Sequence, residues 1–278
     1  MRKTWLAWAL AAGVAFGGAV QARDIHFSDG NCGYSTDYDV RVTPDGIDFQ
    51  RTAGQPGRVF MHDGQLRVDG REVAVSAGDA ARLRAYETQV RALLPEVAGI
   101  AREGVDIGFA AMRTVLLTFA ENNDERQDMV SRLDQNHRLA LARIDDGLGK
   151  GVWKQHDMDD VIEGSIQASV SDLVGKVTGA AVKAALSGDQ GKVAALEARA
   201  DSLDATIDKE VNARADQLDQ RAAALCPRLG SLDQLQQQMQ FRLQDGSRLV
   251  LLTHDNSNHK KLATATDQAR AAGGDSAH

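Results

Sequence analysis

Residues 63–97 read DGQLRVDGREVAVSAGDAARLRAYETQVRALLPEV, and the spacing of the apolar side chains changes within them. Up to Val75 apolar residues alternate with polar ones. Two Asp-Gly pairs interrupt this part, and they favour tight hairpin turns because such turns need positive φ. From Ser76 onward the apolar residues fall three or four apart, as on one face of a helix. The stretch therefore predicts an antiparallel sheet followed directly by a long helix.

The predicted sheet extends towards the N-terminus. Residues 38–42 and 47–49 alternate in polarity on either side of a Pro-Asp-Gly turn, and an apolar run follows at 59–61. We predict a meander of four or five short strands within residues 36–75. A meander this short needs another element packed on its apolar face.

Local signals also place the ends of the first helices. Ser76 with Asp79 resembles a capping box at the start of the first helix. Pro95 favours a break or a kink in that helix, because proline suits a first helical position better than an interior one. Residues 122–124 (NND) predict a turn and a cap, and the glycines of residues 147–151 mark a flexible connection.

No proline lies between Pro95 and Pro227, which is typical of long helices. Residues 159–187 and 190–225 carry apolar residues at steps of three and four, with charges on the other faces. This pattern predicts amphipathic helices with a coiled-coil-like seam. The second helix would be roughly 50 Å long, so we expect residues 159–187 to be its antiparallel partner.

The C-terminal part leaves two interpretations open. Ser231 with Gln234 predicts the cap of a short helix after Pro227. Residues 240–253 then favour a hairpin around an Asp-Gly pair, and the alternative is a continued helix through Leu243. The residues beyond are small and polar, which indicates a disordered tail.

The first 22 residues have the composition of a secretory signal peptide. Arg2 and Lys3 precede an apolar run from Thr4 to Gly18, and we expect cleavage after Ala22. The run is too short for a spanning helix, which needs about 20 residues. We therefore expect an exported, periplasmic chain with no membrane span after cleavage.

Export makes the two cysteines informative. An even pair in an oxidising compartment usually forms a disulfide, so we expect a bond between Cys32 and Cys226. Two buried free thiols are the alternative. The bond would hold the start of the sheet beside the end of the long helical region.

The expected fold is of the α+β class, with a small antiparallel meander, long helices and a C-terminal hairpin that joins the sheet. We expect five parts: a signal peptide (1–22), a β-meander (23–75), a helical region with a long helical hairpin (76–225), a short helix and hairpin that close on the sheet (226–253), and a disordered tail (254–278).

Several segments are similar to those of a known family: Cys32, residues 38–44 (YDVRVTP), 68–70 (VDG), 91–100 (RALLPEVAGI) and 225–227 (LCP). On these segments the chain resembles the YggN-like family of uncharacterised exported proteins of Gram-negative bacteria. The resemblance covers most of the chain after residue 22. It implies a periplasmic location, and it implies no reaction and no catalytic residues.

Composition and motifs argue against several functions. The formal charge of −7 argues against a general nucleic-acid binder, which needs a basic field. The chain lacks the motifs of serine hydrolases and zinc proteases. Residues 147–151 (GLGKG) follow a helix and lack the ending of a phosphate loop, so they indicate a helix stop. We expect no catalytic residue and no cofactor.

Candidate metal ligands are sparse. His156, Asp157, Asp159 and Asp160 are the densest group, but they lack the spacing of a calcium loop, and helix capping is the favoured role. A second group, His254, Asp255 and His259, lies at the expected tail, where solvation is favoured over weak metal binding. His137 falls near the apolar stripe of a helix and is expected at its boundary. We expect no metal site.

A row of small residues comprises Gly164, Ala168, Gly175 and Gly179. Small residues permit close approach of helices. We favour tight packing within the protein, with a docking surface as the alternative.

The sequence therefore favours a non-enzymatic protein that acts by protein–protein interaction through its long helices. The expected partner is an envelope protein or a second copy of the chain. One alternative is an envelope hydrolase with carboxylates assembled in space, for which a deep pocket with two acids, or with a histidine and an acid, would be diagnostic. Another is a carrier of an apolar ligand between the helices.

Overall fold

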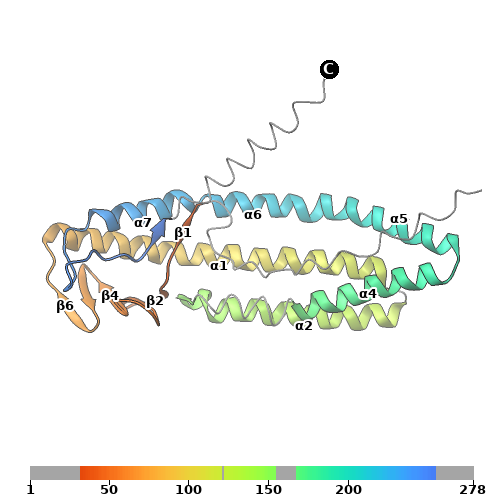
Figure 1. Ribbon diagram of the computed structural model, residues 1–278, viewed down its shortest axis with the longest axis horizontal. Helices are drawn as coiled ribbons and strands as arrows, with labels where there is room; N and C mark the ends of the chain where they lie inside the picture. The colour runs from red at the N-terminus through yellow and green to blue at the C-terminus, as the bar shows by residue number, and fades with distance from the viewer. Residues whose placement is uncertain (1–31, 121, 155–166, 255–278) are drawn as a thin grey trace, which may run out of the picture.

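The computed structural model describes residues 32–120, 122–154 and 167–254. A sheet lies at one end of the molecule, and long helices extend away from it (Figure 1). Strands come first in the chain, helices follow, and the last strand pairs with the first. The fold is of the expected α+β class.

The main sheet has six strands in the order β6-β5-β4-β3-β2-β7, with antiparallel neighbours throughout. The predicted meander comprises β2 (Asp39–Thr43), β3 (Gly46–Gln50), β4 (Arg58–His62), β5 (Gln65–Val68) and β6 (Arg71–Val73). Asp63 and Asp69 have φ of 44° and 48°, each before a glycine of positive φ. Both Asp-Gly pairs thus form the predicted turns.

The sixth strand was not expected from the sequence. β7 (Val152–Trp153) follows the short 3-10 helix η1 (Leu148–Lys150) and pairs with β2, where Trp153 lies opposite Val40. Gly151 has φ of 79°, and a Cβ at this position would lie 2.7 Å from the carbonyl oxygen of Val42. Glycine therefore lets this connection return to the sheet edge.

Helix α1 (Ala77–Phe119) covers the inner face of the sheet. Ile47, Met61 and Leu66 of the sheet are fully buried in one core with Leu83 of α1. Ser76 caps the helix as predicted, since its side chain accepts a hydrogen bond from the N–H of Asp79 at 3.1 Å. The helix thus supplies the cover that the short strands need.

α1 continues through Pro95, so the predicted break at this residue is wrong. Leu93, Leu94, Val97 and Ala98, on either side of the proline, are all buried in the same core. This packing offsets the backbone hydrogen bond that proline removes, and the helix stays whole.

The other helices pack along α1. They are α2 (Asn123–Asp146), α4 (Gln167–Leu186), α5 (Gln190–Ile207), the π-helical turn η3 (Asp208–Asn212), α6 (Ala213–Ala223) and α7 (Cys226–Gln238). Asn122 caps α2 as predicted. In Figure 1, α5, α6 and α7 follow one another along α1. The long helix expected at 190–225 therefore has α1 as a partner besides α4, because α1 is not interrupted at Pro95.

The C-terminal segment differs from both interpretations of the sequence. α7 begins at Cys226 with Pro227 in its first turn, and not at a cap on Ser231. Residues 239–252 contain a turn, in which the N–H of Leu243 donates to the carbonyl of Ser247, but no regular ladder. β8 (Thr253–His254) then pairs with β1 (Tyr34–Ser35).

A buried side chain takes the place of the missing ladder. Gln236 Oε1 accepts hydrogen bonds from the N–H groups of Leu251 and Leu252 at 2.6 and 2.9 Å, and its Nε2 donates to the carbonyl of Leu252 at 2.9 Å. The backbone is thus paired by an amide side chain, as it would be by a neighbouring strand.

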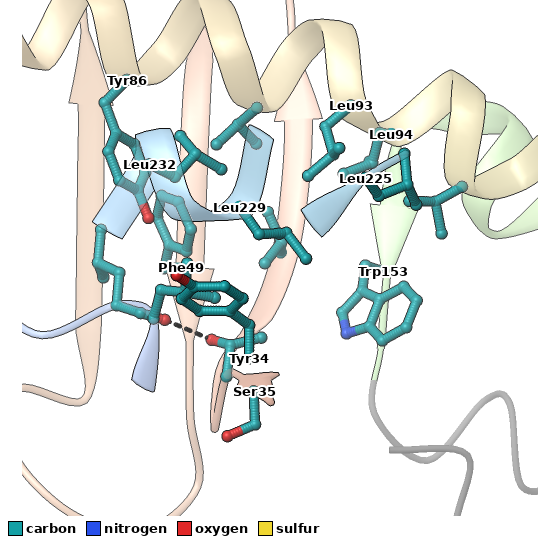
Figure 2. A pocket seen from close by; sticks show the side chains of 16 residues that line it. Tyr34, Ser35, Phe49, Tyr86, Leu93, Leu94, Trp153, Leu225, Leu229 and Leu232 are labelled. Atoms are coloured by element: carbon teal, nitrogen blue, oxygen red, sulfur yellow. Dashed lines mark hydrogen bonds between the residues drawn. The ribbon is translucent and has the colours of Figure 1, made fainter. Parts of the chain in front are cut away.

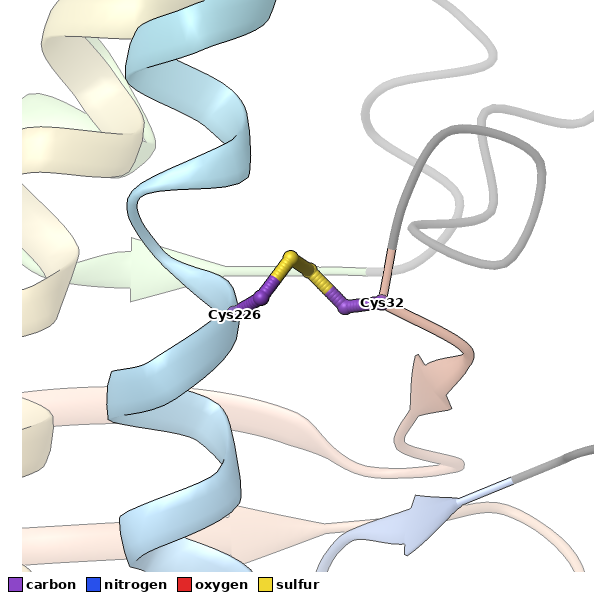
Figure 3. The surroundings of a disulfide bond; sticks show 2 residues. All are labelled: Cys32 and Cys226. Atoms are coloured by element: carbon purple, nitrogen blue, oxygen red, sulfur yellow. A yellow bond between two sulfur atoms is a disulfide. The ribbon is translucent and has the colours of Figure 1, made fainter.

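A disulfide joins Cys32 to Cys226, the pair expected from the sequence (Figure 3). The two Cα atoms lie 5.2 Å apart, and the residues are 194 positions apart in the chain. Cys32 precedes β1 and Cys226 begins α7. The bond therefore holds the N-terminal strand beside the start of α7.

We expect this bond to contribute strongly to stability. A bridge across so long a loop should stabilise by a few kcal/mol, which corresponds to several degrees in melting temperature. Cys32→Ser and Cys226→Ser should lower the melting temperature by similar amounts, and the double variant should lose little more than either. Finding two alkylatable thiols in the unfolded, non-reduced protein would contradict the bond.

Asp79 links the start of α1 to the C-terminal segment. It is 1% exposed, and its carboxylate accepts hydrogen bonds from the N–H of Gln240 and from Arg82 Nη1, both at 3.0 Å, and from Ser76 Oγ at 3.2 Å. Burial on its own raises the pKa of Asp79. The hydrogen bonds and the charge of Arg82 outweigh burial, so the pKa lies below its ordinary value.

This depressed pKa predicts a loss of stability in acid. The contribution of the Asp79 carboxylate is complete above about pH 4, the ordinary pKa of the unfolded chain, and disappears as the pH falls through the lower folded value. Asp79→Asn should remove this part of the pH dependence and lower stability at neutral pH by roughly 1–3 kcal/mol. Urea unfolding at a series of pH values measures both effects. Asp45→Asn, at an exposed position in the β2–β3 turn, is the control and should change neither.

Candidate functional site

An apolar cavity of about 130 Å³ lies between the inner face of the sheet, α1 and α7 (Figure 2). Sixteen residues line it, and they come from β1, β2, β3, α1, β7, α7 and the C-terminal segment. For comparison, an engineered apolar cavity of about 150 Å³ binds benzene. The cavity is thus large enough for a molecule of about one ring.

Two helices supply about half of the residues in the cavity wall. α1 contributes Tyr86, Val90, Leu93, Leu94 and Val97, and the N-terminal part of α7 contributes Leu229 and Leu232, preceded by Leu225. These residues recur at steps of three and four, which places them on one face of each helix. Figure 2 shows the labelled side chains of Tyr86, Leu229 and Leu232 around the shared space.

β1 and the C-terminal segment close another side of the cavity. Thr36 Oγ1 donates a hydrogen bond to the carbonyl of Leu251 at 2.6 Å, drawn as the dashed line in Figure 2. Tyr34 and Ser35 line the cavity beside this contact, and Trp153 of β7 lines it from the edge of the main sheet. Because Cys32 lies two residues before Tyr34, the disulfide fixes this wall to α7.

Two tyrosines bring hydroxyl groups to the cavity. Tyr86 is 2% exposed, and Tyr34 is partly buried. Burial, followed by the negative charge of Asp233, raises the pKa of Tyr86 and of Tyr34. Both hydroxyls therefore stay protonated at neutral pH and can donate a hydrogen bond.

The described residues that line the cavity include no carboxylate, histidine or lysine. A hydrolase site needs acids, or a histidine with an acid, around the reacting bond. The cavity therefore lacks the groups that the hydrolase alternative requires.

Two histidine–carboxylate pairs occur elsewhere, and neither lines the cavity. His62 Nδ1 lies 3.4 Å from Glu87 Oε1, but Glu87 also accepts hydrogen bonds from the N–H of Asp63 and from Arg91. Burial on its own raises the pKa of Glu87, and these hydrogen bonds outweigh burial and lower it. Glu87 thus anchors the β4–β5 turn to α1.

The second pair joins α1 to α2. His137 Nε2 lies 2.7 Å from Asp106 Oδ1, and the ring of His137 stacks on Phe109 with centroids 4.8 Å apart. The ring nitrogen of His137 thus contacts the carboxylate of Asp106, and the face of the ring packs on the apolar cluster that contains Phe109. This is the boundary position predicted for His137.

An open hollow of about 510 Å³ lies beside the β5–β6 hairpin and the C-terminal turn, and it contains Asp69, Glu72 and Asp245. Asp69 Oδ1 accepts a hydrogen bond from the N–H of Arg58 at 2.8 Å, and Asp245 Oδ1 accepts one from the N–H of Ser247 at 2.9 Å. Asp69 therefore ties the β5–β6 turn to β4, and Asp245 stabilises its own turn.

The candidate metal ligands fall mostly outside the described residues: His156, Asp157, Asp159 and Asp160, and Asp255 with His259. His254 is described, and its ring stacks on Tyr34 with centroids 4.3 Å apart. Within residues 32–120, 122–154 and 167–254, no three His, Cys, Asp or Glu residues are grouped as a metal site requires.

The small residues of α4 do not pack as predicted. A Cβ at Gly175 or Gly179 would meet no atom within 4 Å, so the expected tight packing is wrong for these two positions. Gly164 and the side chain of Ala168 lie outside the described part. α4 packs through other residues, such as Leu173, which contacts the core between α1 and α2.

α4 also exposes a row of large apolar side chains, here called the α4 stripe: Val170, Val174, Val182 and Leu186. Val174 is 58% exposed and Leu186 is 82% exposed. At 3.6 residues per turn each step of four moves a side chain about 40° around the axis, so the stripe winds around α4, and Val170 and Leu186 lie roughly 160° apart. Val174 and Val182 are close enough around the helix to share one exposed face.

The cavity does not follow from the sequence. Tyr86 falls within the helical spacing that begins after Ser76, and Trp153 follows the glycine-rich connection at residues 147–151. The one available signal is that Tyr86 brings a hydroxyl into a stripe that is otherwise aliphatic, at a position expected to be buried. Tyr34 and Leu251 carry no such signal, because only the tertiary fold brings them together.

No helix in the described part of the chain has both the length and the apolar composition needed to cross a membrane. No match was found among curated proteins or among solved structures. A family model described as "Protein of unknown function (DUF2884)" matches residues 32–252, from the first cysteine to the end of the C-terminal segment, and the chain therefore belongs to that family.

Proposed function

We propose that this protein acts by binding, not by catalysis, and that the cavity takes a small apolar molecule. The cavity itself carries the proposal, because its wall is formed by aliphatic and aromatic side chains from both the sheet and the helices. Pockets of this composition are the usual sites for small ligands. A cavity of this size suits a single ring or a short alkyl chain.

The protein then acts in the periplasm as an exported protein. Residues 1–22 have the composition of a signal peptide, and the Cys32–Cys226 disulfide is of a kind that persists in oxidising compartments. The resemblance to the YggN-like family supports the same location. The apolar lining of the cavity supports a role without catalysis.

Trp153 provides a direct measurement of binding. From Arg23 onward it is the only tryptophan of the chain, and it lines the cavity. Titration of residues 23–278 with toluene should change the Trp153 fluorescence and raise the melting temperature. Val90→Phe, which fills the cavity from α1, should abolish both effects.

The matched control is Val250→Phe, which adds the same ring at an exposed position outside the cavity. It should leave toluene binding unchanged. Circular dichroism establishes that each variant is folded. The binding function would be ruled out if neither toluene nor phenol affects the protein, or if folded Val90→Phe binds as well as the parent chain.

A second candidate function is protein–protein interaction through the long helices, with a second copy of this chain as the partner. The α4 stripe favours it, because Val174 and Val182 are both exposed, share one face of α4 and are symmetric about Thr178. In an antiparallel pair of copies, Val174 of one copy would face Val182 of the other, so one surface would complement itself. An envelope protein would not need this symmetry.

We expect the double variant Val174→Glu, Val182→Glu to reduce self-association, because it would bury charges where two copies of α4 pair. Sedimentation equilibrium over a range of concentrations measures the effect. Val250→Glu removes another exposed apolar residue and should leave association unchanged. A parent chain that stays monomeric at the highest concentration reached would eliminate the second copy as partner.

A further inference from the structure

The hydroxyl of Tyr86 opens onto the cavity and has no hydrogen-bond partner among the described residues. Tyr86 is 2% exposed and lines the cavity, and its Oη makes no hydrogen bond within the described residues. Figure 2 shows this oxygen among the apolar side chains of the cavity wall. Buried tyrosine hydroxyls ordinarily find a hydrogen-bond partner, because leaving one unpaired destabilises the protein.

A second tyrosine of the same core shows the usual arrangement. Tyr38 is 1% exposed, and its Oη donates a hydrogen bond to the carbonyl of Pro56 at 3.0 Å. Tyr38 does not line the cavity. The unpaired hydroxyl of Tyr86 is therefore a property of the cavity wall and not of every tyrosine in this core.

The charge near the cavity restricts what can pair with Tyr86. Asp233 of α7 acts electrostatically on both Tyr86 and Tyr34, which line the cavity. Its carboxylate accepts a hydrogen bond from Gln237 Nε2 at 2.8 Å, and the lining offers no cation to an anionic ligand. A carboxylate or phosphate inside the apolar cavity would therefore be repelled and unpaired. A neutral oxygen has neither disadvantage.

We propose that the ligand is a small neutral molecule with a hydrocarbon body and one oxygen, and that this oxygen pairs with Tyr86 Oη. Phenols, short alcohols and ketones belong to this class. The inference rests on the binding function proposed above and adds its specificity. The hydrocarbon body fills the cavity, and Tyr86 distinguishes the oxygen-bearing molecule from a plain hydrocarbon of the same shape.

Phenol and toluene test this specificity, because they differ by a hydroxyl in place of a methyl group. Calorimetry gives the affinity of each for the parent chain and for Tyr86→Phe. The phenol-to-toluene affinity ratio should fall by roughly 3- to 10-fold in Tyr86→Phe, as expected for one hydrogen bond. Comparing ratios cancels the difference in hydration between the two probes. Benzoate, the anionic probe, should not bind.

Tyr38→Phe is the matched control, since it removes a hydroxyl that is paired and lies outside the cavity. It should lower the melting temperature and leave the affinity ratio unchanged, whereas Tyr86→Phe should not lower the melting temperature of the ligand-free protein.

An unchanged ratio in Tyr86→Phe would overturn this inference and leave the binding function standing. So would an equal fall in Tyr38→Phe, or benzoate binding as tight as that of phenol. If neither phenol nor toluene binds the parent chain, the binding function fails, and this inference fails with it.

Discussion

The burial of the inner face of the sheet against α1 is the constraint on which the other elements depend. The strands of the meander are short, and their side chains are buried because α1 lies across them. The same helix continues through Pro95 beyond the sheet, so α2, α4, α5 and α6 can pack along its remaining length. One unbroken helix thus joins the core of the sheet to the core of the helical region.

Polar side chains then fix the segments that have little regular structure. Asp79, at the start of α1, bonds the backbone of Gln240, which is 161 residues away in the chain. Gln236 pairs the backbone of residues 251–252, and Glu87 holds the β4–β5 turn. These carboxylates and amides are buried and fully engaged. Gln236 replaces a backbone ladder at Leu251 and Leu252, which line the cavity, and the two carboxylates fix turns and chain ends outside it.

The parts of the fold that follow from the sequence are those with local signals. The Asp-Gly turns and the caps at Ser76 and Asn122 depend on residues a few positions apart, and all are found where predicted. The continuity of α1 at Pro95 depends on the packing of distant residues, which no local pattern reports. The same holds for β7 and for the C-terminal segment. The cavity is the extreme case, because its wall combines residues as far apart as Tyr34 and Leu252.

The cavity and the hydroxyl of Tyr86, which has no partner among the described residues, lie in the same place. A cavity in a core loses dispersion contacts, and a larger side chain at a position such as Val90 would restore them. A phenylalanine at position 86 would remove the unpaired polar atom. A molecule that fills the space and supplies an oxygen would restore the missing dispersion contacts and pair the Tyr86 hydroxyl.

The α4 stripe, by contrast, lies on a helix that contributes nothing to the cavity wall. Self-association there would therefore leave the cavity free to bind its ligand.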